Sequence, residues 1–190
     1  MDTIRTSAKF KHYDGLYGDI DHKPQAEYIF LEQIETRSKE FGWMVDPHIH
    51  SHLYQLFFIE SGKVKFQSSS QSTNLPIPCV IFIPPNTLHG LHYSANVKGQ
   101  ILTLSDNVID SLFTSHSAVM LSIENLHLIS FSDKNSVSFS AILKLVKQIH
   151  EELFSECFEK RLMLESFFRQ LIIYVCSLTK IPWSTSLSRN

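Results

Sequence analysis

The pattern of hydrophobic and polar positions changes at about residue 133. Before that point, short runs that are fully apolar or alternate with period two are separated by turn residues. After it, apolar residues recur at helical spacing over two long segments. A series of strands followed by a series of helices predicts an α+β fold.

The first part of the chain contains several segments typical of short strands. Residues 53–60 are apolar on both faces, as in a strand inside a sheet, whereas residues 63–67 alternate and should have one solvated face. Residues 68–74 are polar and predict a loop. Further strands are predicted over residues 28–34, 78–83, 91–93 and 99–104. Roughly seven or eight strands of this kind favour a closed antiparallel barrel or jelly roll.

The second part predicts two amphipathic helices joined near residues 156–160. Glu165 and Arg169 form an i,i+4 pair that supports the second helix. This helical hairpin could pack against the barrel, form a dimer interface, or do both. For the interface we predict the apolar stripe of the second helix, which consists of Leu164, Phe167, Phe168, Leu171, Ile172 and Val175.

Composition narrows the functional classes. Hydrophobic residues make up 43% of the chain and charged residues 19%, which suits a globular protein with a real core. The formal net charge is −2 and no basic stripe is present, which argues against nucleic-acid binding by this chain itself. No stretch approaches the ~18 to 20 apolar residues that cross a bilayer, so we expect a cytoplasmic protein without membrane contact.

Three cysteines without a CxxC spacing argue against a zinc-cysteine site or a disulfide framework. The chain also lacks a Gly-x-Ser-x-Gly element and a Gly-rich phosphate loop. Catalysis would therefore have to depend on a metal.

A histidine cluster offers the richest chemistry. His48, His50 and His52 alternate along one predicted strand and could share a face, although we expect His52 to face solvent. His89 follows a Pro84-Pro85 turn further along the chain. This arrangement resembles the two cupin motifs, in which a His-x-His pair, a Glu and a closing Gly are followed by a Pro-rich turn and a third His. In this chain Gln55 replaces the Glu, and Gly62 is the closing Gly.

Two uses of this cluster remain open. His48, His50, Gln55 and His89 could hold a divalent metal, but the neutral Gln55 would leave the charge of the ion uncompensated. The alternative is recognition of a small molecule. By alternation Gln55, Phe57 and Tyr93 would line an apolar chamber with a few polar groups, which is typical of ligand pockets. A barrel filled entirely by side chains is a further alternative.

Taken together, the chain resembles the N-terminal half of AraC-type transcription regulators, in the subgroup that controls breakdown of aromatic acids such as 4-hydroxybenzoate and 4-hydroxyphenylacetate. The resemblance covers about residues 10–180. It rests on three stretches, residues 16–19 (Leu-Tyr-Gly-Asp), 32–62 and 83–90. In this subgroup Gln is familiar at the position of Gln55, so the departure that weakens the metal hypothesis supports a regulator.

The resemblance implies a cupin barrel over residues 1–132 that binds an effector, and a two-helix dimerisation segment over residues 133–180. It also implies that residues 181–190 begin a linker to a DNA-binding domain, which would provide all contact with DNA. We therefore predict a homodimeric, non-enzymatic sensor of a hydroxylated aromatic acid, with no required cofactor. A metal-dependent cupin dioxygenase or isomerase is the alternative. The predicted ligand-binding residues are Arg37, Trp43, His48, His50, Gln55, Phe57, His89 and Tyr93.

Overall fold

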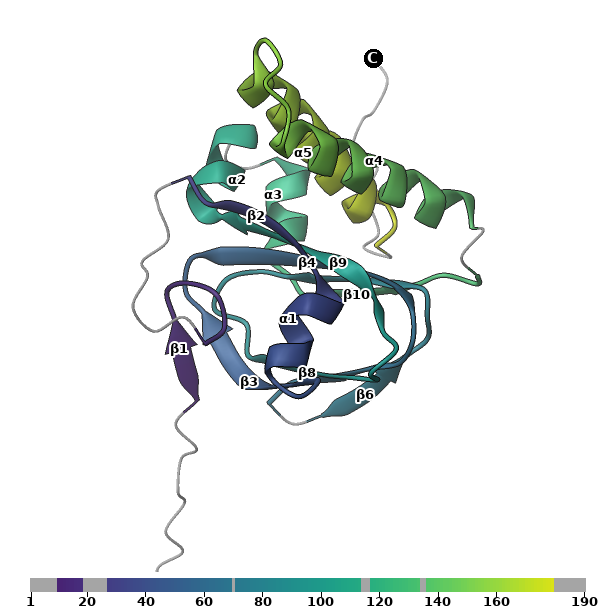
Figure 1. Ribbon diagram of the computed structural model, residues 1–190. Coiled ribbons are helices and arrows are strands. Elements are labelled where there is room, and N and C mark those ends of the chain that lie inside the picture. Colours follow the sequence, from purple (N-terminus) through teal and green to yellow (C-terminus); the bar gives the residue numbers. More distant parts are fainter. Residues whose placement is uncertain (1–9, 19–26, 70, 114–116, 134–135, 180–190) are drawn as a thin grey trace, which may run out of the picture.

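The computed structural model describes residues 10–18, 27–69, 71–113, 117–133 and 136–179. Two five-stranded sheets form a barrel, and a helical hairpin covers the outer side of one sheet (Figure 1). The α+β class and the barrel followed by a helical hairpin are confirmed. The predicted linker, residues 181–190, lies outside the described residues.

The first sheet has the strand order β1-β3-β8-β5-β6. β1 pairs with β3 in parallel, and the other neighbours are antiparallel. The strands are β1 (Lys11–Tyr13), β3 (Met44–His50), β8 (His89–Tyr93), β5 (Val64–Gln67) and β6 (Ser72–Leu75). β6 occupies part of the predicted loop at residues 68–74. It is an edge strand whose side chains are mostly exposed, so it has no apolar pattern to reveal it.

The second sheet has the strand order β10-β7-β4-β9-β2, and its strand pairs are all antiparallel. The strands are β10 (His127–Ser130), β7 (Cys79–Ile83), β4 (Leu53–Ser61), β9 (Lys98–Ser105) and β2 (Ile29–Gln33). β4 lies at the centre between β7 and β9, which explains why the sequence of this strand is apolar on both faces.

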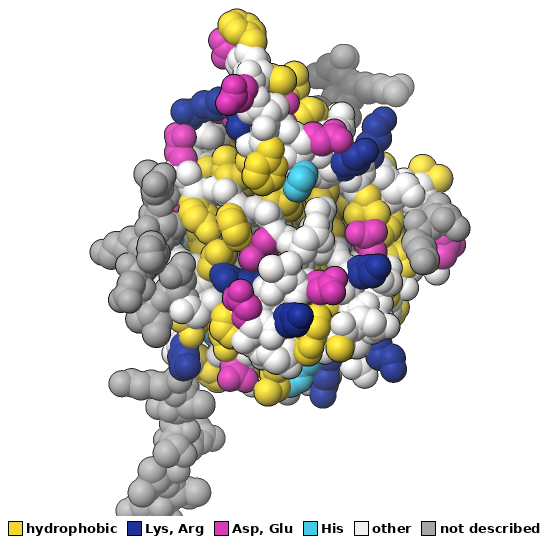
Figure 2. Space-filling view, viewed as in Figure 1, with side chains coloured by type: hydrophobic (Ala, Val, Ile, Leu, Met, Phe, Trp, Pro, Cys, Tyr) yellow, Lys and Arg dark blue, Asp and Glu magenta, His cyan; other side chains and the backbone are white. Residues whose placement is uncertain are grey.

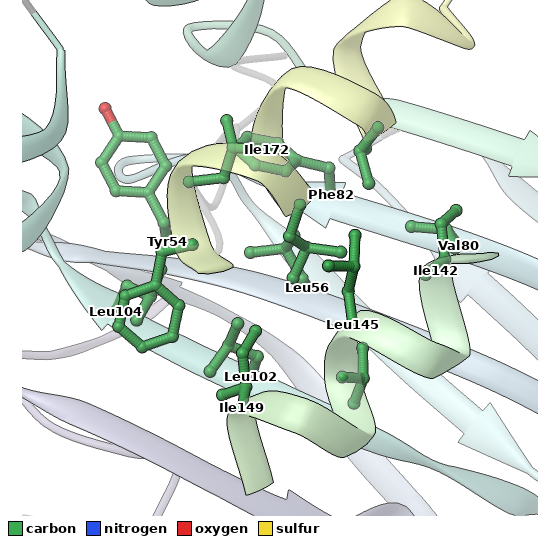
Figure 3. Close-up of a cluster of buried hydrophobic side chains, with 14 of the residues drawn as sticks. Tyr54, Leu56, Val80, Phe82, Leu102, Leu104, Ile142, Leu145, Ile149 and Ile172 are labelled. Atoms are coloured by element: carbon green, nitrogen blue, oxygen red, sulfur yellow. The ribbon is translucent and has the colours of Figure 1, made fainter. Parts of the chain in front are cut away.

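The two faces of β4 enter two separate hydrophobic clusters. Phe57 and Ile59 point into the barrel, together with side chains from β5, β7, β8 and β9. Leu56 and Phe58 belong to the other cluster, which packs under the helices. Figure 3 shows Leu56 in this cluster. At the end of β4, Gly62 has φ +95°, and a Cβ there would lie 2.6 Å from the Cα of Val97. Only glycine fits this turn, which is the closing Gly of the predicted motif.

The predicted helical hairpin consists of α4 (Val137–Leu153) and α5 (Lys160–Ser177). The predicted dimer stripe on α5 needs a correction, because most of its side chains lie inside the chain. Ile172 and Val175 are fully buried and Leu164 is 6% exposed, in the cluster between α5, α4 and the outer face of the sheet. Phe167 is only partly buried and packs against the same cluster. These residues form intrachain core, so a second copy cannot reach them without unpacking α5.

Three short helices precede residue 133 and were not predicted: α1 (Ile34–Glu40), α2 (Asp106–Leu112) and α3 (Ala118–Ile123). Each has six or seven residues, which is too short for helical periodicity to stand out from a strand pattern. α2 and α3 contact α5 and extend the helical layer over the sheet. Among the described residues, no helix is long and apolar enough to span a membrane.

Candidate functional site

Three buried histidines meet on the first sheet. β3 carries His48 and His50, and β8 carries His89, which is the cross-strand partner of His48. The side chains are 1–2% exposed, and one ring nitrogen from each lies within 4.8 Å of those of the others. The alternation of β3 and its pairing with β8 therefore bring together the histidines that the sequence predicts to converge. His52 faces solvent as expected and pairs with Asp106 at 2.8 Å.

Backbone carbonyls fix the proton positions of two rings. His48 Nδ1–H donates to the Asp46 carbonyl and His89 Nδ1–H donates to the Thr87 carbonyl, both at 2.8 Å. The Nε2 atom of each ring is therefore a bare acceptor. His48 Nε2 accepts from His50 Nε2 at 3.0 Å, and His89 Nε2 has no partner. A hydrogen bond from Nδ1 to a backbone oxygen is typical of histidines whose Nε2 binds a metal.

Burial keeps the three imidazoles neutral. Desolvation lowers the pKa of His48 to about 4, and it lowers that of His50 to about 3 with help from the neighbouring His48. The pKa of His89 is also lowered well below its usual value, first by burial and then by His48 and His50. At neutral pH the cluster therefore presents electron pairs and carries no charge.

Aromatic rings enclose the cluster. The Tyr17 ring lies 4.5 Å from that of His48, and the Tyr13 ring lies 5.7 Å from His48 and 6.2 Å from His50. Tyr13 comes from β1, whose parallel pairing with β3 sets it opposite His50. Tyr17 belongs to the Leu-Tyr-Gly-Asp segment of the sequence.

A small cavity of about 30 Å³ lies inside the barrel beside the histidines. Six of the eight predicted ligand-binding residues line it, whereas Trp43 and His50 do not. Trp43 packs against the hydrophobic cluster inside the barrel, and His50 contributes to the histidine cluster alone. The lining comprises Tyr17, Glu32, Arg37, Ser38, Val45, His48, Gln55, Phe57, His89, Leu91, Tyr93 and Ile101.

Several buried polar atoms around this cavity have no hydrogen-bond partner. They are Arg37 Nη2, Ser38 Oγ, Gln55 Oε1 and His89 Nε2. An unsatisfied buried polar group costs about 1–3 kcal/mol, and native proteins hold few of them. These four atoms are available to form hydrogen bonds with a molecule bound in the cavity.

Two charged residues face each other at the same cavity. Arg37 Nε lies 3.5 Å from Glu32 Oε1. Burial raises the pKa of Glu32, and the positive charge of Arg37 offsets part of that effect. Glu32, Ser38 and Tyr17 were not predicted as site residues. Glu32 lies at the end of β2, just before α1, and Ser38 lies within α1. Only recognition of that helix could have pointed to these two residues.

The histidine cluster also suits a divalent cation. Among the described residues, His48, His50 and His89 are the group of His, Cys, Asp or Glu side chains whose ligand atoms lie close enough to share an ion. Neutral imidazoles with free nitrogen atoms are the form that binds metals such as Zn²⁺, Cu²⁺, Fe²⁺ and Ni²⁺. Gln55, on the facing sheet, adds an unpartnered oxygen at the same cavity. The residues present therefore fit a metal.

A comparison with protein families decides the assignment. Residues 37–172, which include most of the hairpin and all three histidines, match the family described as the AraC-like ligand binding domain. The chain belongs to this family. The matched part of this AraC-like domain extends from α1 into α5 and contains eight of the ten strands. The match points to a ligand-binding domain and not to the metal-dependent enzyme that the histidines alone would also allow.

Solved structures similar to this AraC-like domain include ToxT from Vibrio cholerae, at 12% identity and a TM-score of 0.46, over 80% of this chain and 56% of that chain. ToxT bound to (E)-4-(8-methylnaphthalen-1-yl)but-3-enoic acid has 14% identity, a TM-score of 0.43, and coverage of 77% and 55%. A cupin-like protein from Thermotoga maritima has 12% identity, a TM-score of 0.25, and coverage of 60% and 83%. The chain spans a little over half the length of these ToxT chains. Curated protein sequences gave no significant match.

Proposed function

We propose that this AraC-like domain is the effector-sensing part of a cytoplasmic transcription regulator and that its effector is a small hydroxylated aromatic acid bound inside the barrel. The observation that carries this proposal is the group of unpartnered polar atoms around the cavity. A ligand with a ring and hydrogen-bonding groups at both ends would satisfy these atoms, while Phe57 and Tyr93 would contact the ring.

The cavity has to enlarge to admit such a ligand. A volume of about 30 Å³ corresponds to one water molecule, whereas small-molecule pockets usually exceed ~300 Å³. α1 supplies two lining residues, Arg37 and Ser38, and lies in front of the barrel in Figure 1. We infer that α1 shifts when the effector binds, because it is a short helix, whereas the strands are held by ladders on both sides.

The proposed regulator is a homodimer that contacts DNA through a C-terminal domain beyond this chain. Since the predicted stripe of α5 is buried, we assign the dimer contact to the opposite face of α5. There Leu162, Met163 and Ile173 are 58%, 46% and 47% exposed. On the face shown in Figure 2, lysine and arginine side chains are interspersed with aspartate and glutamate, which supports leaving DNA contact to another domain.

A ligand-binding measurement tests the proposal. The thermal midpoint of the chain is measured with 4-hydroxybenzoate, 4-hydroxyphenylacetate and cinnamate. A ligand present at 100 times its Kd stabilises by about 2.7 kcal/mol, which raises the midpoint by roughly 5–10 °C in a chain of this size. Gln55→Leu should remove most of this shift, because it removes the unpartnered oxygen at the cavity.

His52→Gln is the matched control, since His52 lies on the loop between β3 and β4 but faces solvent. It should retain the full ligand-induced shift. If none of the three acids changes the thermal midpoint of the unmodified chain, the proposed effector class is wrong.

A further inference from the structure

The cavity lacks an unpaired positive charge for the carboxylate of the proposed effector. An aromatic acid carries a carboxylate, and a buried carboxylate needs a nearby positive charge. Arg37 is the cationic residue of the lining, and it already faces the carboxylate of Glu32. The cationic side chain of the lining is therefore already paired before the effector enters.

The histidine cluster can supply the missing charge by holding a cation. Its three ring nitrogens lie within 4.8 Å of one another. Asp46 and Thr87 hold the protons of His48 and His89 on Nδ1. Binding would need the proton of His50 to move from Nε2, which faces His48, to Nδ1, which has no hydrogen-bond partner. The cluster therefore needs one tautomer change to present three free nitrogens.

The neutral side chain of Gln55 determines how much of the charge of such a cation the protein compensates. A glutamate at this position would offset half of the charge of a divalent ion. Gln55 is neutral, so three histidines and Gln55 would leave the full +2 charge inside a buried cavity. A cation held in this way is strongly stabilised by an anion from outside the protein. The same substitution that weakens the case for a permanent metal makes the site suited to a carboxylate ligand.

We propose that His48, His50 and His89 bind a divalent cation, and that this cation anchors the carboxylate of the effector. The ring hydroxyl of the effector then faces the Glu32–Arg37 pair, where it can donate to the carboxylate and accept from Arg37 Nη2. This proposal rests on the proposed function, and it makes effector binding dependent on the metal. By thermodynamic linkage the effector tightens metal binding by the same factor.

The test uses the chain freed of metal with a chelator and then loaded with Co²⁺ or Zn²⁺. Isothermal titration should give one cation per chain. 4-Hydroxybenzoate should bind at least about tenfold more tightly to the loaded chain than to the metal-free chain, within the range usual for coupled sites. It should also change the visible absorption spectrum of bound Co²⁺, which reports directly on the ligands of the ion.

Gln55→Glu is the decisive variant. The added carboxylate should tighten Co²⁺ binding and weaken 4-hydroxybenzoate binding, whereas simple damage to the fold would weaken both. His89→Ala should lose stoichiometric Co²⁺, and the exposed His52→Ala should keep it. Circular dichroism confirms that each variant is folded.

The outcomes separate this proposal from the proposed function. If no cation binds, or if 4-hydroxybenzoate binds equally well with and without metal, the metal anchor is overturned while the aromatic-acid sensor stands. An unchanged Co²⁺ spectrum on effector binding also overturns the anchor. If the cation binds but none of the three aromatic acids binds in either state, both the anchor and the proposed effector class are wrong.

Discussion

The two faces of β4 are built in opposite ways. On the outer face Leu56 and Phe58 are completely buried under α4 and α5, in a layer of apolar side chains. On the inner face Gln55 has an unpartnered oxygen beside a small cavity. The outer face maximises burial and thereby stabilises the fold. The inner face gives up stability to keep polar atoms available, which is expected of a binding site.

Truncation of large side chains on the two faces should reveal this difference. Phe58→Ala should lower the free energy of unfolding by about 3–5 kcal/mol, because the outer layer cannot close around the lost ring. Phe57→Ala should cost clearly less, since Phe57 already borders a cavity and the neighbouring side chains can move. Urea denaturation of both variants measures the two values. An equal or larger cost for Phe57→Ala would show that the inner face is packed as tightly as the outer one.

Acid should lower the free energy of unfolding through the buried histidines beside the inner face of β4. The pKa of His48 is about 4 in the folded chain and near 6.5 when unfolded, so the unfolded chain binds more protons between these values. Stability is therefore fully present above pH 6.5 and is lost as the pH falls toward 4. The loss attributable to His48 alone is about 3 kcal/mol, from 1.36 kcal/mol for each pKa unit.

Urea unfolding of the metal-free chain at several pH values between 7 and 4.5 checks this expectation. His48→Gln should flatten the dependence, and the exposed His52→Gln should leave it as in the unmodified chain. A dependence that His48→Gln leaves unchanged would mean that burial of His48 contributes nothing to acid sensitivity.

Removing an unpartnered polar atom should stabilise the chain. Gln55→Leu replaces the amide with an apolar group of similar size, which removes the cost of the buried Gln55 oxygen. We expect the free energy of unfolding to rise by about 1–2 kcal/mol while effector binding is lost. Leu56→Asn, its neighbour on the outer face, should instead destabilise strongly. A gain in stability that leaves effector binding intact would place the effector elsewhere.

Much of this comparison could be predicted from the sequence. The apolar run at residues 53–60 predicted a strand buried on both faces, and alternation placed Gln55 and Phe57 on the inner one. The spacing of His48 and His50 and the turn before His89 predicted the cluster. These predictions succeeded because strand alternation fixes the face of a residue once the strand itself is recognised.

The parts that could not be predicted depend on tertiary contacts. Arg37 was predicted as a ligand-binding residue, but α1 has only seven residues, so nothing in its local pattern indicated a helix that also brings Ser38 to the cavity beside Glu32. The buried stripe of α5 has the periodicity expected of either an interface or a core, and periodicity alone does not distinguish them. Whether the stripe is core or interface depends on which surface of α5 packs toward the sheet. α2 and α3 contact α5 and complete the helical layer over the sheet.

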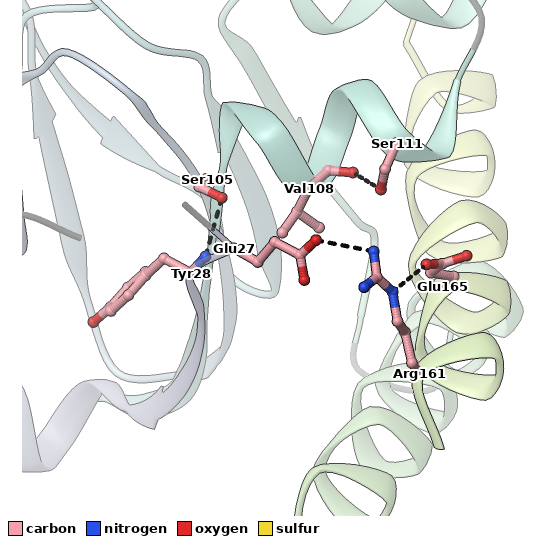
Figure 4. Close-up of polar contacts among 7 residues, drawn as sticks. All are labelled: Glu27, Tyr28, Ser105, Val108, Ser111, Arg161 and Glu165. Carbon is pink, nitrogen blue, oxygen red and sulfur yellow. Dashed lines mark hydrogen bonds and ion pairs between the residues drawn. The ribbon is translucent and has the colours of Figure 1, made fainter. Parts of the chain in front are cut away.

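Polar contacts at the surface should matter least. Arg161 joins Glu27 at 2.9 Å and Glu165 at 3.0 Å (Figure 4), and these residues line a pocket between β2, α2 and α5. All three side chains retain contact with solvent, so water and salt can replace these ion pairs. Arg161→Met should leave the thermal midpoint unchanged within error at physiological salt.

Arg169→Met is the matched comparison, because Arg169 Nε donates to the Leu112 carbonyl at 2.8 Å in a partly buried position. It should lower the midpoint measurably, since that carbonyl at the end of α2 would lose its partner. A larger effect of Arg161→Met than of Arg169→Met would contradict this expectation. It would show that the exposed ion pairs stabilise the helical layer more than the partly buried hydrogen bond of Arg169 does.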